Sequence, residues 1–330
     1  MANGQWYPPE WPERIRALAE GTLTPVVPRR AATVMLLKDT GSGSGSEDTG
    51  SRAEGDGTGS RAEGDGTGSR AEGADSSPEE TGSRPAVHML RRRASMAFAG
   101  GAYAYPGGGV DPRDDDHHVR WAGPTRAWWA SRLGVDETAA QAIVCAAVRE
   151  TYEEAGVLLA GPAADTVVGD TTGDDWETDR AALVARDLSF AEFLDRRGLV
   201  LRSDLLGAWT RWITPEFEPR RYDTFFFVAV LPEGQRTRNA STEADRTVWI
   251  RPAEAIDGYD RGNLLMMPPT IATLRQLGAY GSAADALAAA PGRDMTPVLA
   301  QARLVDGELV LSWPGHDEFT KHIPTGGASA

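Results

Sequence analysis

Hydrophobic and polar positions along the chain alternate between two patterns, one typical of buried strands and one typical of helices. A helix is predicted from Asp136, which can cap it, to Ala155, with Gly156 as its stop. A short tryptophan-rich helix is predicted around 128–129, and 262–290 also has a helical pattern. Strands are predicted at 32–37, 86–90, 206–213, 224–230 and 247–250. Because strands and helices mix without a regular βαβ rhythm, the pattern predicts an α/β fold in which helices flank a mixed sheet.

Between the first two predicted strands lies a long polar segment. Residues 40–84 contain no Val, Ile, Leu, Met, Phe, Trp or Tyr, and a nine-residue unit at 49–57 repeats at 58–66 and, imperfectly, at 67–75. A solenoid would bury an apolar position in every repeat, whereas this unit offers a single alanine. We therefore expect a disordered insertion in an enlarged hairpin loop, and we expect its deletion to leave melting temperature and activity nearly unchanged.

Charge and cysteine content narrow the class of protein. The chain has 34 Lys and Arg against 48 Asp and Glu, a net charge of -14, which argues against binding to nucleic acid or an anionic membrane. Cys145 is the only cysteine, which excludes an intrachain disulfide and a cysteine-based zinc site. No signal peptide or membrane span is evident, so a cytoplasmic location is expected. The sequence leaves a homodimer open.

The predicted helix 136–155 carries three carboxylates on one face. At about 100° per residue, Glu150, Glu153 and Glu154 fall within about a third of the circumference, and Val144 and Val148 lie on the other side. Three close carboxylates repel one another unless a cation neutralises them, and oxygen ligands suit Mg²⁺ or Mn²⁺. By themselves, the glutamates also fit an ordinary solvated helix face.

The segment around these glutamates, Arg149-Glu-Thr-Tyr-Glu-Glu-Ala-Gly-Val157, resembles the core of the Nudix box, whose pattern is Arg-Glu-apolar-x-Glu-Glu-x-Gly-apolar. Six of its seven specified positions match, and Thr151 departs. The usual spacing would place the first glycine of the box at 135 and its first glutamate at 141, where Val135 and Gln141 stand. Glycines occur instead at 107–109, so we expect an insert at 110–135.

The resemblance extends beyond the box and implies a domain organisation. Segments 88–93, 102–111, 220–226 and 243–256 are similar to an insert-bearing Nudix subgroup that includes the mammalian organellar coenzyme A diphosphatases. This resemblance implies a Nudix-type α/β/α sandwich over residues 30–275. An N-terminal extension at 1–29 would precede it, and a helical C-terminal elaboration at 276–330 would follow as a lid or a cap.

The same resemblance implies a reaction and a set of site residues. A small-molecule substrate, a nucleoside diphosphate linked to another moiety, would be hydrolysed with Mg²⁺ or Mn²⁺ held by Glu150, Glu153 and Glu154, while Arg149 orients a glutamate. Glu150 is the first candidate for the general base, with Glu216, Glu218 and Glu243 as alternatives. The expected substrate-binding residues are the glycine turn and four arginines: Arg92, Arg93, Gly107, Gly108, Arg220 and Arg221.

The resemblance specifies the substrate less directly than it specifies the reaction. Coenzyme A or acyl-coenzyme A is the preferred substrate, although Ala97 and Tyr105 depart from the fuller coenzyme A signature. The alternatives are an ADP-ribose or dinucleotide pyrophosphatase and, in another class, a Nudix-fold sensor that binds a nucleotide without cleaving it. Three intact glutamates favour the enzyme.

Two further features have a structural and a functional interpretation. The run Asp114-Asp-Asp-His-His118 contains possible metal ligands but is typical of a solvated insert. Trp128 and Trp129 have a shape suited to stacking on a base, but adjacent aromatics on a short helix more often anchor it to the core. We expect the solvated run and the core anchor.

Overall fold

The computed structural model describes residues 8–41, 47–48, 84–95, 99–241, 243–305 and 308–323. The expected disorder of the repeats at 49–75 and the expectation for Ala97 lie outside the described residues.

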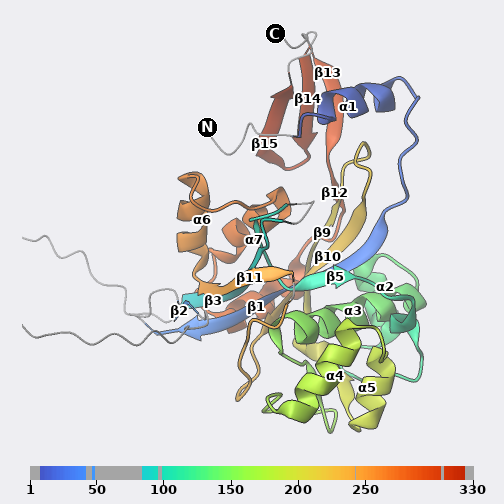
Figure 1. Cartoon of the computed structure of the whole chain (residues 1–330), viewed down its shortest axis with the longest axis vertical. Coiled ribbons are helices and arrows are strands. Elements are labelled where there is room, and N and C mark those ends of the chain that lie inside the picture. The colour runs from blue at the N-terminus through green and yellow to red at the C-terminus, as the bar shows by residue number, and fades with distance from the viewer. Residues whose placement is uncertain are drawn as a thin grey trace, which may run out of the picture.

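A mixed sheet forms the centre of the molecule, as predicted (Figure 1). Its main strands are β1 (Arg29–Thr40), β3 (Arg84–Arg92), β9 (Gly207–Ile213), β10 (Tyr222–Val230) and β11 (Ala244–Ile250). The described strand order is β12-β9-β10-β1-β3-β11-β2, with β4 paired to β3 and β5 paired to β1. The short strands are β2 (Glu47–Asp48), β4 (Tyr103–Ala104), β5 (Gly107–Gly109) and β12 (Val298–Leu299). β1 runs parallel to β10 and antiparallel to β3.

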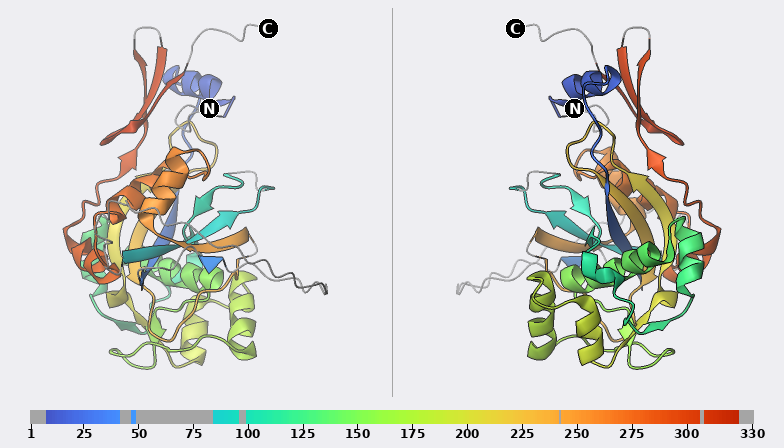
Figure 2. Two further views of the ribbon diagram at one scale, coloured as in Figure 1. Left: turned by 90° about the vertical axis from the view of Figure 1, so that its left-hand side faces the viewer. Right: turned by 90° about the vertical axis from the view of Figure 1, so that its right-hand side faces the viewer.

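Helices cover both faces of this sheet, which confirms the α/β/α sandwich (Figure 2). One layer contains α2 (Arg126–Leu133), α3 (Glu137–Ala155), α4 (Asp174–Val184) and α5 (Phe190–Arg196). The other contains α6 (Pro252–Asp260), α7 (Pro268–Leu277) and α8 (Ala283–Ala289). Alternate residues of β1 point to the two layers: Val34 and Leu36 pack toward α3, and Met35 and Leu37 pack toward α7.

The predicted carboxylate helix, α3, is set by its caps and its buried face. The Asp136 side chain accepts a hydrogen bond from the Ala139 amide at 2.8 Å, and Gly156 closes the helix with φ +70°. Between these ends the buried face packs on the sheet. The neighbouring helix α2 is anchored by Trp129, which is buried against Phe227, whereas Trp128 is exposed. The core-anchor interpretation therefore holds for Trp129 alone.

The two strands predicted on either side of the insertion form an antiparallel pair. β1 and β3 pair from Leu37 with Val87 to Thr40 with Arg84. Within the insertion, Glu47–Asp48 form β2 and pair with β11. Backbone pairing does not require an apolar side chain, so composition alone does not reveal such a strand.

The C-terminal extension contains a helix, as expected, and also a small sheet that the pattern did not indicate. After α7 and α8, which are separated at 278–282, the chain forms β13 (Gln301–Val305), β14 (Glu308–Trp313) and β15 (His316–Ile323). Along β14, alternate residues Leu309, Leu311 and Trp313 are buried, which is the strand period. Helix α1 (Trp11–Ala19) lies beside this small sheet, and its buried residues Trp11 and Ile15 belong to the same apolar cluster (Figure 1).

Several short elements have no counterpart in the predicted pattern. Helices α4 and α5 lie between α3 and β9 in the chain. A small sheet has the strand order β6-β8-β7; β7 and β8 also lie between α3 and β9, whereas β6 precedes α2. The strands of that sheet are β6 (Trp121–Ala122), β7 (Ala160–Gly161) and β8 (Val200–Arg202), and three 3-10 turns are η1 (Pro112–Asp115), η2 (Ser203–Leu205) and η3 (Ala290–Gly292). Among the described helices, none combines the length and apolar character needed to cross a bilayer.

Candidate active site

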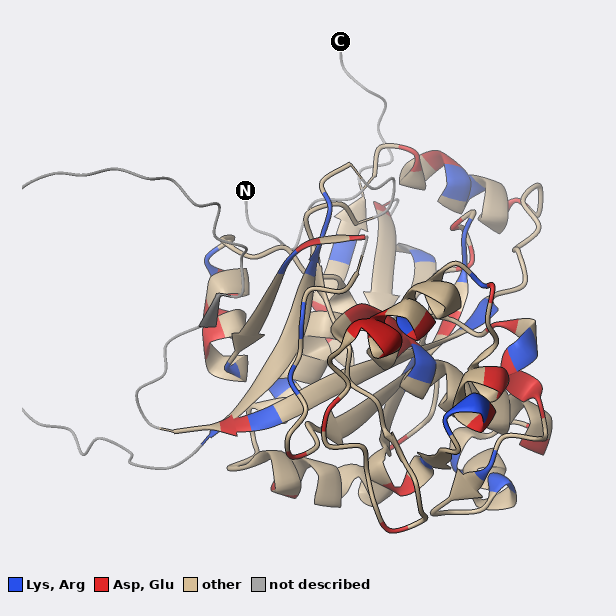
Figure 3. Cartoon of the chain, turned by 60° about the horizontal axis from the view of Figure 1, so that its bottom comes forward, with Lys and Arg blue, Asp and Glu red and all other residues tan. Residues whose placement is uncertain are grey.

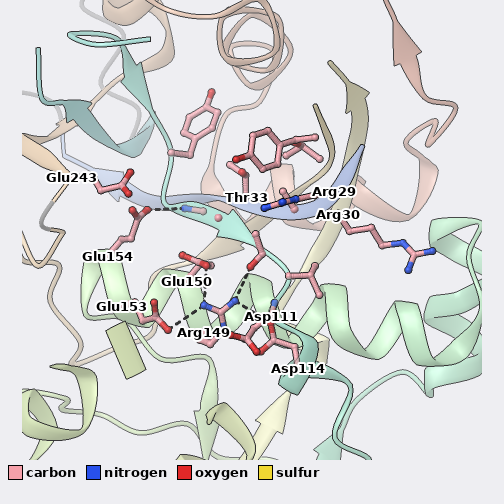
Figure 4. A pocket seen from close by; sticks show the side chains of 18 of the residues that line it. Arg29, Arg30, Thr33, Asp111, Asp114, Arg149, Glu150, Glu153, Glu154 and Glu243 are labelled. Carbon is pink, nitrogen blue, oxygen red and sulfur yellow. Dashed lines mark hydrogen bonds and ion pairs between the residues drawn. The ribbon is translucent and has the colours of Figure 1, made fainter. Parts of the chain in front are cut away.

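A cavity of about 930 Å³ opens where the sheet divides (Figure 4). β3 pairs with β1 at residues 37–40, but at 31–33 the partner of β1 is β5. The chain crosses between them at Tyr105 and Pro106, from β4 to β5. The carboxylate end of α3 lies against this crossing, and α4, α5, β10 and the start of α7 contribute further walls. None of the described residues in 276–330 lines the cavity.

Arg149 is the centre of the polar network in this cavity. Its Nη1 donates to Glu150 Oε1 at 2.8 Å and to Glu153 Oε1 at 3.1 Å. Its Nη2 donates to the carbonyl oxygen of Gly109 at 2.9 Å. Nε and Nη2 together hold both carboxylate oxygens of Asp114 at 3.0 Å. Such a two-pronged pair fixes the plane of the guanidinium, and thereby the rotamers of the two glutamates.

The role of Asp114 corrects the expectation for its sequence neighbourhood. Asp114 is 2% exposed and ion-paired, so it does not belong to a solvated run. It follows Gly108 by six residues, which is the separation that the Nudix box has between its first glycine and its first acid. Asp114 therefore stands at that separation from the glycine turn, whereas position 141 holds Gln141. Gln141 instead bonds Arg126 and the Asp116 carbonyl oxygen.

The glycine turn lies in contact with two of the glutamates. The Gly107 amide donates to Glu154 Oε2 at 2.8 Å. A Cβ atom at Gly108 would lie 2.5 Å from the carboxyl carbon of Glu150, closer than side chains pack. A Cβ atom at Gly107 would lie 2.6 Å from the carbonyl oxygen of Ala32 in β1. Gly107 therefore fits against the backbone of β1, whereas a side chain at Gly108 would have to displace the Glu150 carboxylate.

Burial and mutual repulsion place an electrostatic strain on the glutamates. Burial, with a further contribution from Glu153, raises the pKa of Glu150 to about 7 against the opposing effect of Arg149. Burial, with the negative charges of Glu150 and Glu243, raises the pKa of Glu154 to about 8. Burial also raises the pKa of Glu153. A divalent cation between these oxygens would offset both the burial and the repulsion, so the chemistry of these residues fits a divalent cation.

The carboxylates do not all converge on one point. Arg149 holds Glu153, and Glu154 is turned to Gly107, with Glu150 between them (Figure 4). In the described chain, the compact group of three potential ligands is instead Asp116, His117 and His118, with donor atoms within 4.8 Å of one another. Both histidines are exposed and His118 bonds Asp116, as expected for a solvated run.

The four predicted arginines separate into two pairs. Arg92 and Arg220 line the cavity, whereas Arg93 and Arg221 are not among its lining residues. Arg221 is buried, and its guanidinium donates to the carbonyl oxygens of Val26 at 2.7 Å and Thr214 at 3.1 Å. This side chain ties the loop before β10 to the N-terminal segment and does not line the cavity.

Other lining residues carry no sequence signal of their own. The cavity is also lined by Arg29, Arg30, Arg113, Arg186 and Tyr222, which come from β1, η1, the α4–α5 connection and β10. Of the alternative general bases, Glu243 lines the cavity, whereas Glu216 and Glu218 do not. Figure 3 shows the acidic end of α3 at the middle of one face, with basic segments around it. Only the proximity of these side chains to the glutamates would have singled them out.

Comparison with known proteins accords with this geometry. Residues 131–277 match the family model described as the NUDT19 Nudix domain. The part of the chain that matches is thus similar to a Nudix domain. The solved Nudix hydrolase of Alicyclobacillus acidocaldarius shares the fold, with a TM-score of 0.57 and 24% identity over 80% of this chain and 96% of that one.

Curated relatives include members of the same family at low identity. The putative nudix hydrolase 7 of Caenorhabditis elegans is 27% identical over 58% of this chain and 55% of its own length. The acyl-coenzyme A diphosphatase NUDT19 of Gallus gallus is 26% identical over 60% and 62%, and that of Homo sapiens is 29% identical over 43% and 40%. The chain thus spans a little over half of the length of the first two relatives.

Proposed function

We propose that this protein hydrolyses a phosphoanhydride bond in a nucleoside diphosphate linked to another moiety, with coenzyme A or an acyl-coenzyme A as the preferred substrate. The observation that carries the proposal is the Arg149 network, in which a buried guanidinium aligns two of three glutamates against a glycine turn. The resemblance to proteins named acyl-coenzyme A diphosphatase supports the substrate class.

In this mechanism Glu150, Glu153 and Glu154 would hold Mg²⁺ or Mn²⁺. When bound, such an ion polarises phosphoryl oxygens and lowers the pKa of a coordinated water molecule. Arg149 keeps Glu150 and Glu153 in place, and Asp114 keeps Arg149 in place. The glycine turn at 107–109 lets the backbone approach the glutamates closely. Glu150 and Glu243 both line the cavity and are the carboxylates available as general base.

A catalytic function accounts for the glutamates better than a sensor does. A protein that only binds a nucleotide gains nothing from burying three carboxylates, whose pKa values are raised by that burial. ADP-ribose and dinucleotides remain alternative substrates for the same chemistry. The departure at Tyr105 is explained locally, because its hydroxyl group bonds Thr270 and Thr273 in a buried position.

The test is chromatographic detection of hydrolysis. Coenzyme A, acyl-coenzyme A, ADP-ribose, NADH and diadenosine polyphosphates are each incubated with the protein and Mg²⁺ or Mn²⁺. Release of 3′,5′-ADP and phosphopantetheine is the expected result. Cleavage of another substrate alone would move the substrate assignment, and metal-dependent binding without cleavage of any compound would favour the sensor.

A matched pair of variants tests the metal assignment. Glu153→Gln removes a charge from the cavity, so we expect it to lose most turnover, on the order of 100-fold. Glu137→Gln changes an exposed residue at the other end of the same helix and should retain activity. Full activity of the Glu153 variant would refute the assignment.

A further inference from the structure

The wall of the cavity formed by β1 and β10 carries positive charge that the protein does not neutralise. In the described part of the chain, the guanidinium groups of Arg29 and Arg220 make no hydrogen bond and no ion pair, although both residues line the cavity. Most other arginines around the cavity are held, as Arg149 is by three carboxylates and Arg113 by Asp111. Because the protein as a whole has a net charge of -14, these unneutralised arginines at the cavity wall indicate a binding site for an anionic ligand.

The strand register decides which side chains share this wall. Arg29 is the partner of Tyr222, Ala31 of Thr224 and Thr33 of Phe226, so alternate residues of both strands face the same side, and all six line the cavity. Arg30, which also lines the cavity, is the partner of Asp223. Asp223 does not line the cavity and accepts two hydrogen bonds from Arg211 at 2.7 Å. The acidic residue of this stretch is thereby turned away from Arg29.

The loop that carries Arg220 is firmly anchored. Arg14 Nε donates to the Phe217 carbonyl oxygen at 2.5 Å, and Trp11 Nε1 donates to Glu218 Oε1 at 2.7 Å. Arg221 adds its bonds from the other side of the loop. Helix α1 and the segment after it thus fix the backbone on which Arg220 stands at the cavity edge.

We propose that Arg29 and Arg220 form a subsite for a second phosphate group of the substrate, separate from the diphosphate at the carboxylate cluster, and that the ring of Tyr222 stacks on the nucleobase. The inference rests on the proposed function. Figure 4 shows Arg29 on β1, with the glutamates on the α3 side of β5. The Tyr222 side chain is partly exposed beside Arg29 and is available for stacking. A diphosphate held near the glutamates leaves both arginines free for another phosphate.

Two kinds of substrate supply that second phosphate. One has a phosphate monoester on the ribose, and the other has a longer polyphosphate chain. Guanidinium groups recognise the phosphate oxygens in either case. The subsite therefore predicts that nucleotides with two phosphate groups bind more tightly than nucleotides with one. Comparing a ribose phosphate with a longer polyphosphate chain shows which of the two the subsite binds.

Binding by titration calorimetry in EDTA tests the subsite without relying on hydrolysis. The probes are AMP, adenosine 3′,5′-bisphosphate, and ADP. We expect the bisphosphate to bind about tenfold more tightly than AMP, as one charged hydrogen-bonded contact implies. Arg29→Gln and Arg220→Gln should each lose most of this difference. A gain for ADP alone, lost in the same variants, would support the subsite with a polyphosphate chain as the source.

Controls separate this proposal from the proposed function. Arg261→Gln changes an exposed arginine just after α6, outside the cavity, and should keep the tenfold difference. Tyr222→Leu should weaken AMP and bisphosphate equally. Equal binding of all three nucleotides to the wild-type protein, or a gain that both arginine variants retain, would overturn the subsite. Nucleotide binding is measured without metal and does not depend on hydrolysis. An absence of hydrolysis would therefore refute the proposed function, while the binding data would still test the subsite.

Discussion

At the scale of single residues, the closest contacts of the site lie between backbone and carboxylate. A methyl group at Gly108 would collide with Glu150, whereas one at Gly109 would have open space within 4 Å. We expect Gly108→Ala to displace the carboxylate and reduce kcat/KM on the order of 100-fold, while Gly109→Ala stays near the wild-type value. Steady-state kinetics on the best substrate measures both. Equal effects of the two substitutions would contradict the steric explanation.

Asp114 neutralises a buried charge from outside α3. Asp114→Asn leaves the buried Arg149 guanidinium without its two-pronged partner, so we expect a loss of about 3 kcal/mol in unfolding free energy. Because Arg149 would then orient the glutamates less well, kcat should fall with little change in KM. Urea unfolding and kinetics measure the two effects. Asp115→Asn, at an exposed neighbour, is the control, and matching behaviour of the two variants would refute the positioning role.

His88 makes stability depend on pH. It is buried against Trp249, neither ring nitrogen has a hydrogen-bond partner, and burial, with a smaller effect of Lys38, lowers its pKa to about 3. Below pH about 6.5 the His88 ring is protonated in the unfolded chain but stays neutral in the folded chain. The unfolding free energy therefore falls as the pH falls from about 6.5 toward 3. At pH 5 this contribution is about 2 kcal/mol.

The substitution His88→Phe tests that contribution. It retains an aromatic ring without a titrating group, so we expect the loss of unfolding free energy between pH 7.5 and pH 5 to shrink by about 2 kcal/mol relative to wild type. Denaturant unfolding at both values measures the difference. His117→Phe, at an exposed ring, should leave the wild-type dependence unchanged. A His88→Phe profile that matches wild type would assign the loss to other groups.

At the scale of elements, α1 acts on the cavity through the loop before β10. Arg14→Met removes the hydrogen bond to the Phe217 carbonyl oxygen and loosens the loop that carries Arg220. A loss of about 1 kcal/mol in substrate binding corresponds to roughly a fivefold rise in KM, with kcat unchanged. Glu13→Gln on the exposed side of the same helix is the control. A fall in kcat with unchanged KM would argue against a role through Arg220.

At the scale of the whole molecule, the long insertion joins strands that already meet. Thr40 and Arg84 are direct partners, and the Thr40 hydroxyl group donates to the Arg84 carbonyl oxygen at 3.1 Å. Replacing 41–83 by a two-residue Asn-Gly turn should therefore keep the hairpin. We expect activity within about twofold, and an unfolding free energy changed by less than about 3 kcal/mol, because closure entropy depends only logarithmically on length. A larger loss of either would assign the insertion a structural role.

The sequence by itself determined the features that repeat locally. The alternation in β1 and β10, the caps of α3 at Asp136 and Gly156, and the acidic face of that helix follow from residues close together in the chain. Local geometry links such positions, since side chains three or four residues apart on a helix are neighbours. For this reason the sheet strands and the carboxylate face were predicted correctly from pattern, and the similarity to a Nudix domain from its motif.

Tertiary structure alone decided which distant residues meet. Asp114 reaches Arg149 across 35 positions, and the charge of Arg29 stays unpaired because Asp223 points to the other face of the sheet. Arg221 looks equivalent to Arg220 in the sequence, yet it bonds the N-terminal segment instead of lining the cavity. Such partnerships depend on the packing of segments far apart in the chain, and no local period encodes them.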